Sequence, residues 1–337
     1  MILIIGATGF IGYYTTRAFL EKGYDVLGTG LMDSSNVMEE LGASYVKLDI
    51  SNKDNFEVLP TTGVEGVILL AGLLPANAKV DITKDENADD YIKINTLGTI
   101  NTLEYCRKNN IKKIISTTSY ADIFGHWQKG VAIDDDLPRK YSLIGDHAAY
   151  VISKNAATDM ILYYNAQHGM QGSIFRFPPV YGVGPHNEIY KDGKYYKTGI
   201  GTFIEKAQNG ENIEIWGDPT ITRDIVYVKD VADAFVKAIE SDKACGVYNI
   251  TSNTELSLLD QVKTIIDLYG DKEKSQIVYR PDKKNNTPSF LFSIEKAKRD
   301  FGYNPKFLSY RDMMIDYMKE EKNGVSLVFK DRKKDEK

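Results

Sequence analysis

The sequence has 337 residues, of which 42 are Lys or Arg and 47 are Asp or Glu, so its formal net charge is −5 at pH 7. An apolar fraction of 42% and a charged fraction of 26% are typical of a folded globular protein and exclude a disordered chain. The acidic balance argues against nucleic acid as a ligand, because phosphate backbones bind to basic surfaces, and two cysteines are too few for a disulfide framework or a four-thiolate metal site.

No apolar run approaches the roughly 18 residues that a membrane-spanning helix needs. The first apolar run already begins at Ile2, which leaves no room for a signal peptide. We therefore expect a cytoplasmic protein without a membrane partner and without a bound metal.

Short apolar runs alternate with longer helical patterns along the chain. The first run, Met1–Gly6, is typical of a strand buried on both faces of a parallel sheet. The alternation predicts an α/β fold, a doubly wound parallel sheet of the Rossmann type. The expected strands are Met1–Gly6, Tyr24–Thr29, Tyr45–Ile50, Gly66–Ala71, Lys113–Ser119, Ser173–Phe177, Asp224–Val228 and Gly246–Ile250. The expected helices are Tyr13–Lys22, Tyr91–Asn109 and Val231–Ser241.

The pattern loosens after Arg176, where prolines and glycines mark a loop. Glu188–Lys197 carries Asp192-Gly193 at its centre, which favours a hairpin. Trp216 is interpreted as a packing residue rather than as a platform for a base.

A glycine loop lies between the first strand and the first helix, with the sequence Gly6-Ala-Thr-Gly9-Phe-Ile-Gly12. Gly6 permits a tight turn, Gly9 lets the backbone approach a pyrophosphate, and Gly12 allows close packing of helix on strand. The helix N-terminus then faces the anion. The loop therefore predicts a bound dinucleotide.

The second contact of the dinucleotide is less defined. An acid at the end of the second strand would bind the adenosine ribose and favour NAD, but Gly30 stands there and the next acid is Asp33. Since no arginine follows to bind a 2′-phosphate, NAD and NADP both stay open, with NAD slightly favoured. Asp49, at the end of the third strand, is a candidate contact for adenine.

Tyr150 and Lys154 stand at positions i and i+4 of a predicted helix, so their side chains share one face. A free tyrosine has a pKa of about 10, and a nearby ammonium lowers it. Tyr150 could then exchange a proton with a substrate hydroxyl. The hydroxyl-rich strand end Ser116–Ser119 adds weight, because parallel strands present ligand-facing residues at their carboxyl ends.

The order of these motifs resembles the extended short-chain dehydrogenases/reductases, and among them the NAD-dependent epimerase/dehydratase family that acts on nucleotide sugars. The resemblance runs from Ile2 to about Lys322. It rests on Gly6–Gly12, Asn95-Thr-Leu-Gly98-Thr99, Ser116–Ser119, Tyr150-x-x-x-Lys154, Arg176-Phe-Pro-Pro-Val-Tyr181-Gly182, Gly217-Asp218, Arg223–Asp230, Gly246–Ile250 and Phe301-Gly-Tyr-Asn-Pro305.

The resemblance implies roles for individual residues. Ser119 would position the substrate hydroxyl beside Tyr150, with Thr118 as the second choice, and Lys154 would also reach the nicotinamide ribose. Arg223 would bind the substrate diphosphate. The implied cofactor contacts are Gly6, Thr8, Gly9, Phe10, Ile11, Gly12, Asp49, Ile50, Ala71, Gly72, Asn95, Lys154 and Phe177.

Tyr120-Ala121 follows Ser119 where members that resemble 4,6-dehydratases carry Asp-Glu, so dehydration is disfavoured. A 4-epimerase acting by transient oxidation at C4, with Tyr150 as acid and base, fits the remaining residues. An NADP-dependent reductase of a keto-sugar or other carbonyl and a non-catalytic dinucleotide-binding protein remain as alternatives.

The motif order also divides the chain. We expect an NAD(P)-binding domain over residues 1–176 that the chain re-enters over 223–250, and a smaller C-terminal substrate-binding lobe from 177–222 and 251–322. Residues 323–337 are expected to form a charged tail. By the same resemblance we expect a homodimer, formed through the helices that contain Asn95 and Tyr150.

Overall fold

The computed structural model describes residues 1–75, 78, 87–145, 147–184, 188–191, 194–197, 199–270, 274–284 and 288–329.

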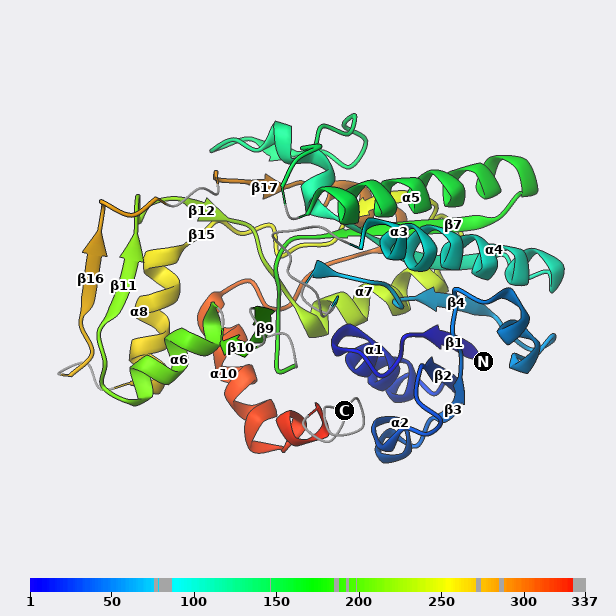
Figure 1. Ribbon diagram of the computed structural model, residues 1–337, viewed down its shortest axis with the longest axis horizontal. Helices are drawn as coiled ribbons and strands as arrows, with labels where there is room; N and C mark the ends of the chain where they lie inside the picture. Colours follow the sequence, from blue (N-terminus) through cyan, green and yellow to red (C-terminus); the bar gives the residue numbers. More distant parts are fainter. Residues whose placement is uncertain are drawn as a thin grey trace.

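A seven-stranded parallel sheet forms the centre of the larger part of the molecule (Figure 1). Its strand order is β14-β7-β5-β4-β1-β2-β3, so the chain reverses direction across the sheet between β1 and β4. Ligands of such sheets bind at this switch point, beyond the carboxyl ends of the strands. The predicted doubly wound sheet is confirmed. Its strands are β1 (Ile2–Ile5), β2 (Val26–Gly30), β3 (Ser44–Lys47), β4 (Gly66–Leu69), β5 (Lys113–Ser119), β7 (Gln171–Phe177) and β14 (Gly246–Asn249).

Helices cover both faces of this sheet. On one face α1 (Phe10–Glu21) packs against α7 (Val228–Glu240), and on the other face α4 (Gly98–Lys108) packs against α5 (Ala148–His168) (Figure 1). Two hydrophobic cores follow from this arrangement, one on each face. The helical region before α4 comprises α3 (Ala88–Tyr91) and a π-helical segment, η3 (Ile92–Leu97). Shorter helical segments are α2 (Asn36–Leu41), η1 (Lys53–Val58) and η4 (Tyr120–His126).

A smaller group of helices and short strands lies beyond the carboxyl ends of the sheet strands (Figure 1). Its two-stranded pairs include β9 (Glu188–Lys191) with β10 (Lys194–Lys197), so the expected hairpin is present. Its helices are α6 (Ile200–Gln208), α8 (Leu258–Tyr269) and α10 (Tyr310–Lys322), whereas α9 (Glu295–Phe301) packs on β14 and α7 of the main sheet. The other paired strands are β6 (Ala132–Ile133) with β17 (Leu291–Phe292), β8 (Val180–Tyr181) with β13 (Val226–Tyr227), β11 (Ile213–Trp216) with β16 (Ile277–Arg280), and β12 (Thr222–Arg223) with β15 (Leu256–Ser257).

Two expectations are corrected here. The strand expected over Asp224–Val228 is only the two residues of β13, which pair with β8 outside the main sheet, while Val228 already begins α7. The expected charged tail is packed over its first part, because residues 325–329 are helical and both Val325 and Phe329 are buried. Phe329 lies against Tyr13 of α1, and its apolar ring explains why this part does not stay in solvent. Residues 330–337 of that tail lie outside the described part.

Candidate active site

The glycine loop joins β1 to α1 in a turn that tolerates no side chain at two positions. Gly6 has φ +91°, and a Cβ there would lie 2.5 Å from the Ala71 nitrogen. A Cβ on Gly12 would lie 2.3 Å from the Gly6 carbonyl oxygen. The loop is therefore held between the end of β4 and the first turn of α1, as the spacing of its glycines predicts.

The N-terminus of α1 is suited to a pyrophosphate. Gly9 is its N-cap, no side chain caps the helix, and the first turn has no acidic residue. The first-turn N–H groups, those of Phe10, Ile11 and Gly12, therefore lack an intrahelical acceptor, and the helix dipole favours an anion there. The helix has 12 residues, and no side chain caps the N–H groups of its first turn. This part of the structure therefore fits the pyrophosphate of a dinucleotide.

The end of β2 carries no acid, and the structure shows what surrounds the gap. A Cβ on Gly30 would lie 3.0 Å from both Thr8 Oγ1 and Tyr45 Oη. Asp33 is 90% exposed and pairs with Lys47 at 2.8 Å, so this acid does not take the place of the ribose-binding one. Neutral hydroxyl groups, rather than a carboxylate, border the predicted ribose position.

Asp49 and Ile50 lie in the loop after β3, which ends at Lys47, earlier than expected. Asp49 Oδ1 accepts hydrogen bonds from Ser51 N at 2.9 Å and Ser51 Oγ at 2.8 Å. Ile50 is buried, and its carbonyl accepts from Asn101 Nδ2 at 2.8 Å. This loop is thus ordered by its own hydrogen bonds, and the adenine contact of Asp49 remains a prediction.

Asn95 links the loop after β4 to the helix that carries the tyrosine. Its Oδ1 accepts from Leu73 N at 2.7 Å, and its Nδ2 donates to Leu73 O at 3.0 Å and to Ser153 Oγ at 2.9 Å. Ser153 Oγ in turn donates to the Tyr150 carbonyl at 2.7 Å. Gly72 is close by, since a Cβ there would lie 3.0 Å from Asn95 Oδ1. Asn95 therefore fixes α5 relative to the switch point, from within a π-helical segment of a kind frequent at functional sites.

Lys154 reaches from α5 to the end of β5. Its Nζ donates to Thr117 Oγ1 at 3.2 Å, and burial lowers the pKa of this lysine to about 8. Strand alternation places Thr117 on the same side of β5 as Ser119, whereas Thr118 points to the other side. The Thr118 hydroxyl is buried there and has no hydrogen-bond partner among the residues that the structure describes. Sequence reasoning missed Thr117, although its spacing of two from Ser119 was a usable signal.

Tyr150 lies one turn before Lys154 on α5, with its ring edge on to Tyr91 at a centroid distance of 6.2 Å. Burial raises the pKa of Tyr150, and the nearby phenols of Tyr120 and Tyr91 raise it further. The expected lowering of this pKa by Lys154 is therefore not seen in the protein alone. Tyr150 Oη makes no hydrogen bond to any described residue.

Arg223 comes to the same region from a distant part of the chain. Its strand β12 pairs with β15, and Arg223 also bridges to Phe290. Burial raises the pKa of Tyr120 and raises that of Tyr181 to about 12, and in both cases the charge of Arg223 opposes the rise. Arg223 is thus within electrostatic reach of Tyr120, which itself acts on Tyr150.

Other predicted residues have structural surroundings. The Phe177 side chain is buried at the end of β7 and packs against Phe175 and Phe235, so its cofactor contact remains a prediction. Trp216 is 48% exposed, with Lys283 Nζ 4.2 Å from its ring centre, so it packs against a lysine at the surface rather than inside a core. The reason is that β11 is one of only two strands in its sheet and its last residue projects outward.

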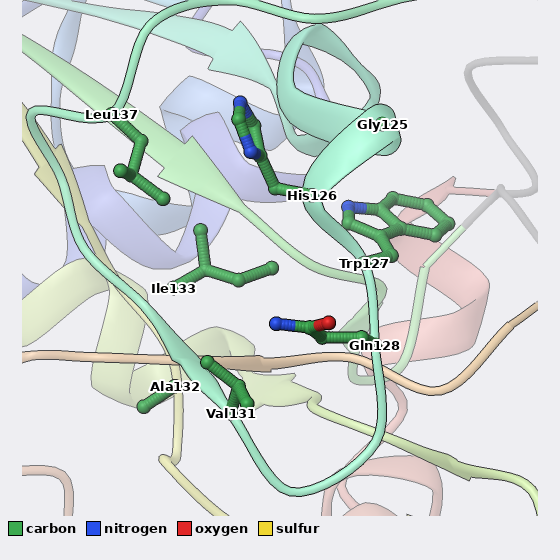
Figure 2. A pocket seen from close by; sticks show the side chains of 8 residues that line it. All are labelled: Gly125, His126, Trp127, Gln128, Val131, Ala132, Ile133 and Leu137. Carbon is green, nitrogen blue, oxygen red and sulfur yellow. The ribbon is translucent and has the colours of Figure 1, made fainter.

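A cavity of about 190 Å³ lies beside this region, in the loop that follows η4 (Figure 2). Residues 125–128 form one wall and residues 131–133 with Leu137 form the other. His126 Nε2 is 2.8 Å from the Pro138 carbonyl oxygen, which fixes the loop. Neither Tyr150 nor Lys154 lines this cavity, so the predicted catalytic pair does not open into it.

No helix of the described residues is long and apolar enough to cross a membrane.

The chain is similar to known proteins over most of its length. The model of the NAD dependent epimerase/dehydratase family matches residues 2–251. A Methanocaldococcus jannaschii protein named "Putative UDP-glucose 4-epimerase" is 33% identical over 314 residues, which cover 91% of this chain and 93% of that protein. UDP-glucuronate 4-epimerase 2 of Arabidopsis thaliana is 26% identical over 90% of this chain and 72% of its own.

Solved structures agree on the fold. UDP-glucose 4-epimerase of Thermotoga maritima, solved with UDP-glucose, has a TM-score of 0.73 at 24% identity and covers 95% of this chain and 99% of its own. UDP-glucuronic acid 4-epimerase of Bacillus cereus, solved with NAD, has a TM-score of 0.72 at 22% identity, with coverages of 95% and 98%. Given the family match and the 33% identical relative, the chain belongs to the NAD dependent epimerase/dehydratase family and is an NAD-dependent enzyme.

Proposed function

We propose that this enzyme is a nucleotide-sugar 4-epimerase that inverts C4 of a UDP-linked sugar. The observation that carries the proposal is the position of Lys154, whose Nζ lies 3.2 Å from Thr117 Oγ1 at the hydroxyl-bearing end of β5, one turn after Tyr150 on α5. Relatives named as UDP-sugar 4-epimerases support the choice of substrate class.

In this proposal the chain's own groups move one proton and hold the sugar. Bound NAD supplies the acceptor, and then the donor, of hydride at the sugar carbon. Tyr150 takes the proton from the sugar O4 hydroxyl as that carbon is oxidised, and returns it after the keto sugar has turned its other face. Ser119 holds the same oxygen, the ammonium of Lys154 favours the phenolate, and Arg223 binds the diphosphate.

The residues after Ser119 favour epimerisation over dehydration. Tyr120 and Ala121 occupy the positions after β5, and burial raises the pKa of Tyr120. Neither residue carries a carboxylate, so neither supplies the acid and base that dehydration needs at a second carbon. The site thus has the tyrosine needed for oxidation and re-reduction at one carbon, and the carboxylate that acts on Tyr150, Asp122, is buried in an ion pair with Arg176 at 2.9 Å.

The division of labour follows the fold. We propose that residues 1–176 and 223–250 bind NAD, and that the groups from 177–222 and 251–322 hold the nucleotide sugar. We also propose a homodimer formed through α4 and α5, whose outer sides carry exposed apolar side chains. These are Ile92 and Leu97, in the π-helical turn before α4, and Ile152 and Tyr163 of α5.

The test is to incubate the purified enzyme with UDP-glucose and with UDP-galactose, without added reductant, and to quantify both sugars. Interconversion without net change in NADH absorbance is expected. Tyr150→Phe should lower the rate by at least ~10²-fold while leaving NAD binding intact. Stoichiometric consumption of NADH or NADPH would instead identify a reductase, and wild-type rates in Tyr150→Phe would refute the proposed acid–base role.

A further inference from the structure

Tyr120 is the residue that directly follows Ser119, and its ring is held in place by other aromatic rings. The ring stacks on Trp127 with a centroid distance of 5.2 Å and an angle of 2°, and packs against Phe290 at 5.6 Å. Figure 2 shows the Trp127 ring on the opposite side of its loop from the Ile133 side chain. Ile123, Ile133, Phe290 and Phe292 form a small hydrophobic cluster of their own, on which Tyr120 and Trp127 pack.

The hydroxyl of this fixed ring has no hydrogen-bond partner in the part of the chain that the structure describes. Tyr120 Oη makes no hydrogen bond to any described residue, although the side chain is only partly exposed and burial raises its pKa. Tyr181, by comparison, donates its hydroxyl to Gln261 Oε1 at 3.1 Å. Unlike the Thr118 hydroxyl, the Tyr120 hydroxyl is not sealed from solvent, so an oxygen of a ligand can reach it. Tyr120 thus offers a neutral donor to a ligand.

The backbone places this donor between the two parts of the proposed site. Phe290, which packs on Tyr120, accepts a hydrogen bond from Asp224 N at 3.0 Å and donates one to Thr222 O at 3.2 Å. Thr222 and Asp224 are the two neighbours of Arg223 in the sequence, so Phe290 lies beside the backbone of Arg223. The Tyr120 ring therefore extends from the end of β5, beside Ser119, to the strand that carries Arg223. Its electrostatic coupling to both Tyr150 and Arg223 is consistent with that position.

We propose that Tyr120 is a substrate-binding residue that donates a hydrogen bond to a hydroxyl oxygen of the sugar and so selects how the sugar sits against Tyr150. The inference rests on the proposed function, because it assumes that a sugar lies at Ser119 and its diphosphate at Arg223. Tyr120 acts on binding and orientation, and not as a second acid or base. The sugar is its partner because Ser119 is its neighbour in the chain, whereas Arg223 serves the phosphates.

The test compares UDP-glucose with UDP, which lacks the sugar. Calorimetric titration of the NAD-loaded Tyr120→Phe variant should show roughly 3- to 10-fold weaker binding of UDP-glucose, the loss of one neutral hydrogen bond, with binding of UDP unchanged. The KM for UDP-glucose should rise by the same factor, with a smaller change in kcat. Tyr24→Phe is the control. The Tyr24 hydroxyl donates to Glu240 Oε1, and Tyr24 lies just before the start of β2, at the amino ends of the sheet strands and away from Ser119.

Thermal unfolding separates this role from a structural one. Phe keeps the stacking on Trp127, and the lost hydroxyl has no partner among the described residues, so the melting temperature of Tyr120→Phe should equal that of the wild type. Equal weakening of UDP and UDP-glucose binding, or no weakening of either, would overturn the proposal. If wild-type enzyme binds UDP-glucose with the expected dependence on Tyr120 but does not epimerise it, the proposed function fails and the Tyr120 contact stands.

Discussion

Lys154 has to carry a positive charge in a place where burial opposes that charge. Its Nζ donates to Thr117 Oγ1 at 3.2 Å, and its pKa falls from 10.5 to about 8 because the surroundings exclude water. In the proposed reaction the ammonium is the form that favours the Tyr150 phenolate. The cation is therefore present below about pH 8 and is lost as the pH rises through that value.

This titration predicts an alkaline limb in the pH profile. We expect kcat/KM of the wild type to fall above about pH 8, as Lys154 becomes neutral. Lys154→Met should lower kcat/KM by roughly 10²-fold or more and should lose that limb. Rates from pH 6 to 10 for both proteins check this. An identical alkaline limb in Lys154→Met would assign it to another group.

The same shift has an independent consequence for stability. Between about pH 8 and 10.5 the unfolded chain binds the Lys154 proton and the folded chain does not, so the free energy of unfolding should increase with pH across that window. Lys154→Met should lack this increase, and denaturant titrations at pH 8 and pH 10 measure it without reference to catalysis.

At the level of residues, local patterns in the sequence predicted the parts of the site that depend on near neighbours. The glycines of the loop and the four-residue spacing of Tyr150 and Lys154 are such patterns. Thr117 and Tyr120 were not predicted, because their roles depend on contacts across 37 residues for Thr117 and across 170 for the ring pair Tyr120–Phe290. The raised pKa of Tyr150 in the protein alone was not predicted for a similar reason, since burial is a property of the fold.

At the level of elements, the junction of β1 and α1 depends on close approach of backbone to backbone. A Cβ on Gly12 would lie 2.3 Å from Gly6 O and 2.6 Å from Ala7 O, and backbone atoms cannot move aside as a side chain can. Gly9 differs, because its φ is −77° and its nearest atom would be 3.3 Å from a Cβ.

The two glycines therefore predict two different phenotypes. Gly12→Ala should destabilise the protein by at least about 1–3 kcal/mol, the usual cost of overpacking, and should lower the melting temperature. Gly9→Ala should nearly keep the melting temperature but weaken NAD binding, because its methyl group enters the space where the pyrophosphate approaches. Calorimetry with and without NAD measures both. A stable, NAD-binding Gly12→Ala would contradict the packing argument.

Main-sheet strands such as β1 and β4 were predictable because they are buried apolar runs, whereas the short strands of the smaller part were not. The two residues of β13 pair with β8, whose last residue, Tyr181, precedes Val226 by 45 positions in the chain. Nothing in a two-residue run specifies that partner. Sequence periodicity thus predicts the long buried elements, whereas the short strands form through tertiary contacts that the local sequence does not specify.

At the level of the whole molecule, charged side chains tie the last helix to the dinucleotide-binding part. Glu320 of α10 is buried and pairs with Arg17 of α1 at 2.9 Å and with Lys229 of α7 at 2.7 Å. Tyr227 also donates to Asp316 of α10 at 2.8 Å. Since α1 begins at the glycine loop, α10 supports the helix whose N-terminus is proposed to hold the pyrophosphate.

The opposite face of the sheet carries the proposed dimer contact. Ile152 and Tyr163 are separated by 11 residues, about three helical turns, so they share one side of α5 and are 38% and 51% exposed. Leu97, just before α4, is 43% exposed and belongs to the helical layer packed on α5. An apolar strip of this kind on a monomer is typical of an interface.

We therefore expect light scattering to give twice the mass of one chain, and Ile152→Glu to shift the protein toward the monomer, because a buried unpaired carboxylate opposes association. Ile315→Glu is the matched control, since Ile315 is 49% exposed on α10 and should leave the mass unchanged. Because the Ile152 side chain is exposed in the single chain, the Ile152→Glu variant should stay folded as a monomer and should still show a cooperative melting transition. A wild-type monomer, or a dimer that tolerates Ile152→Glu as well as Ile315→Glu, would place the contact elsewhere or remove it.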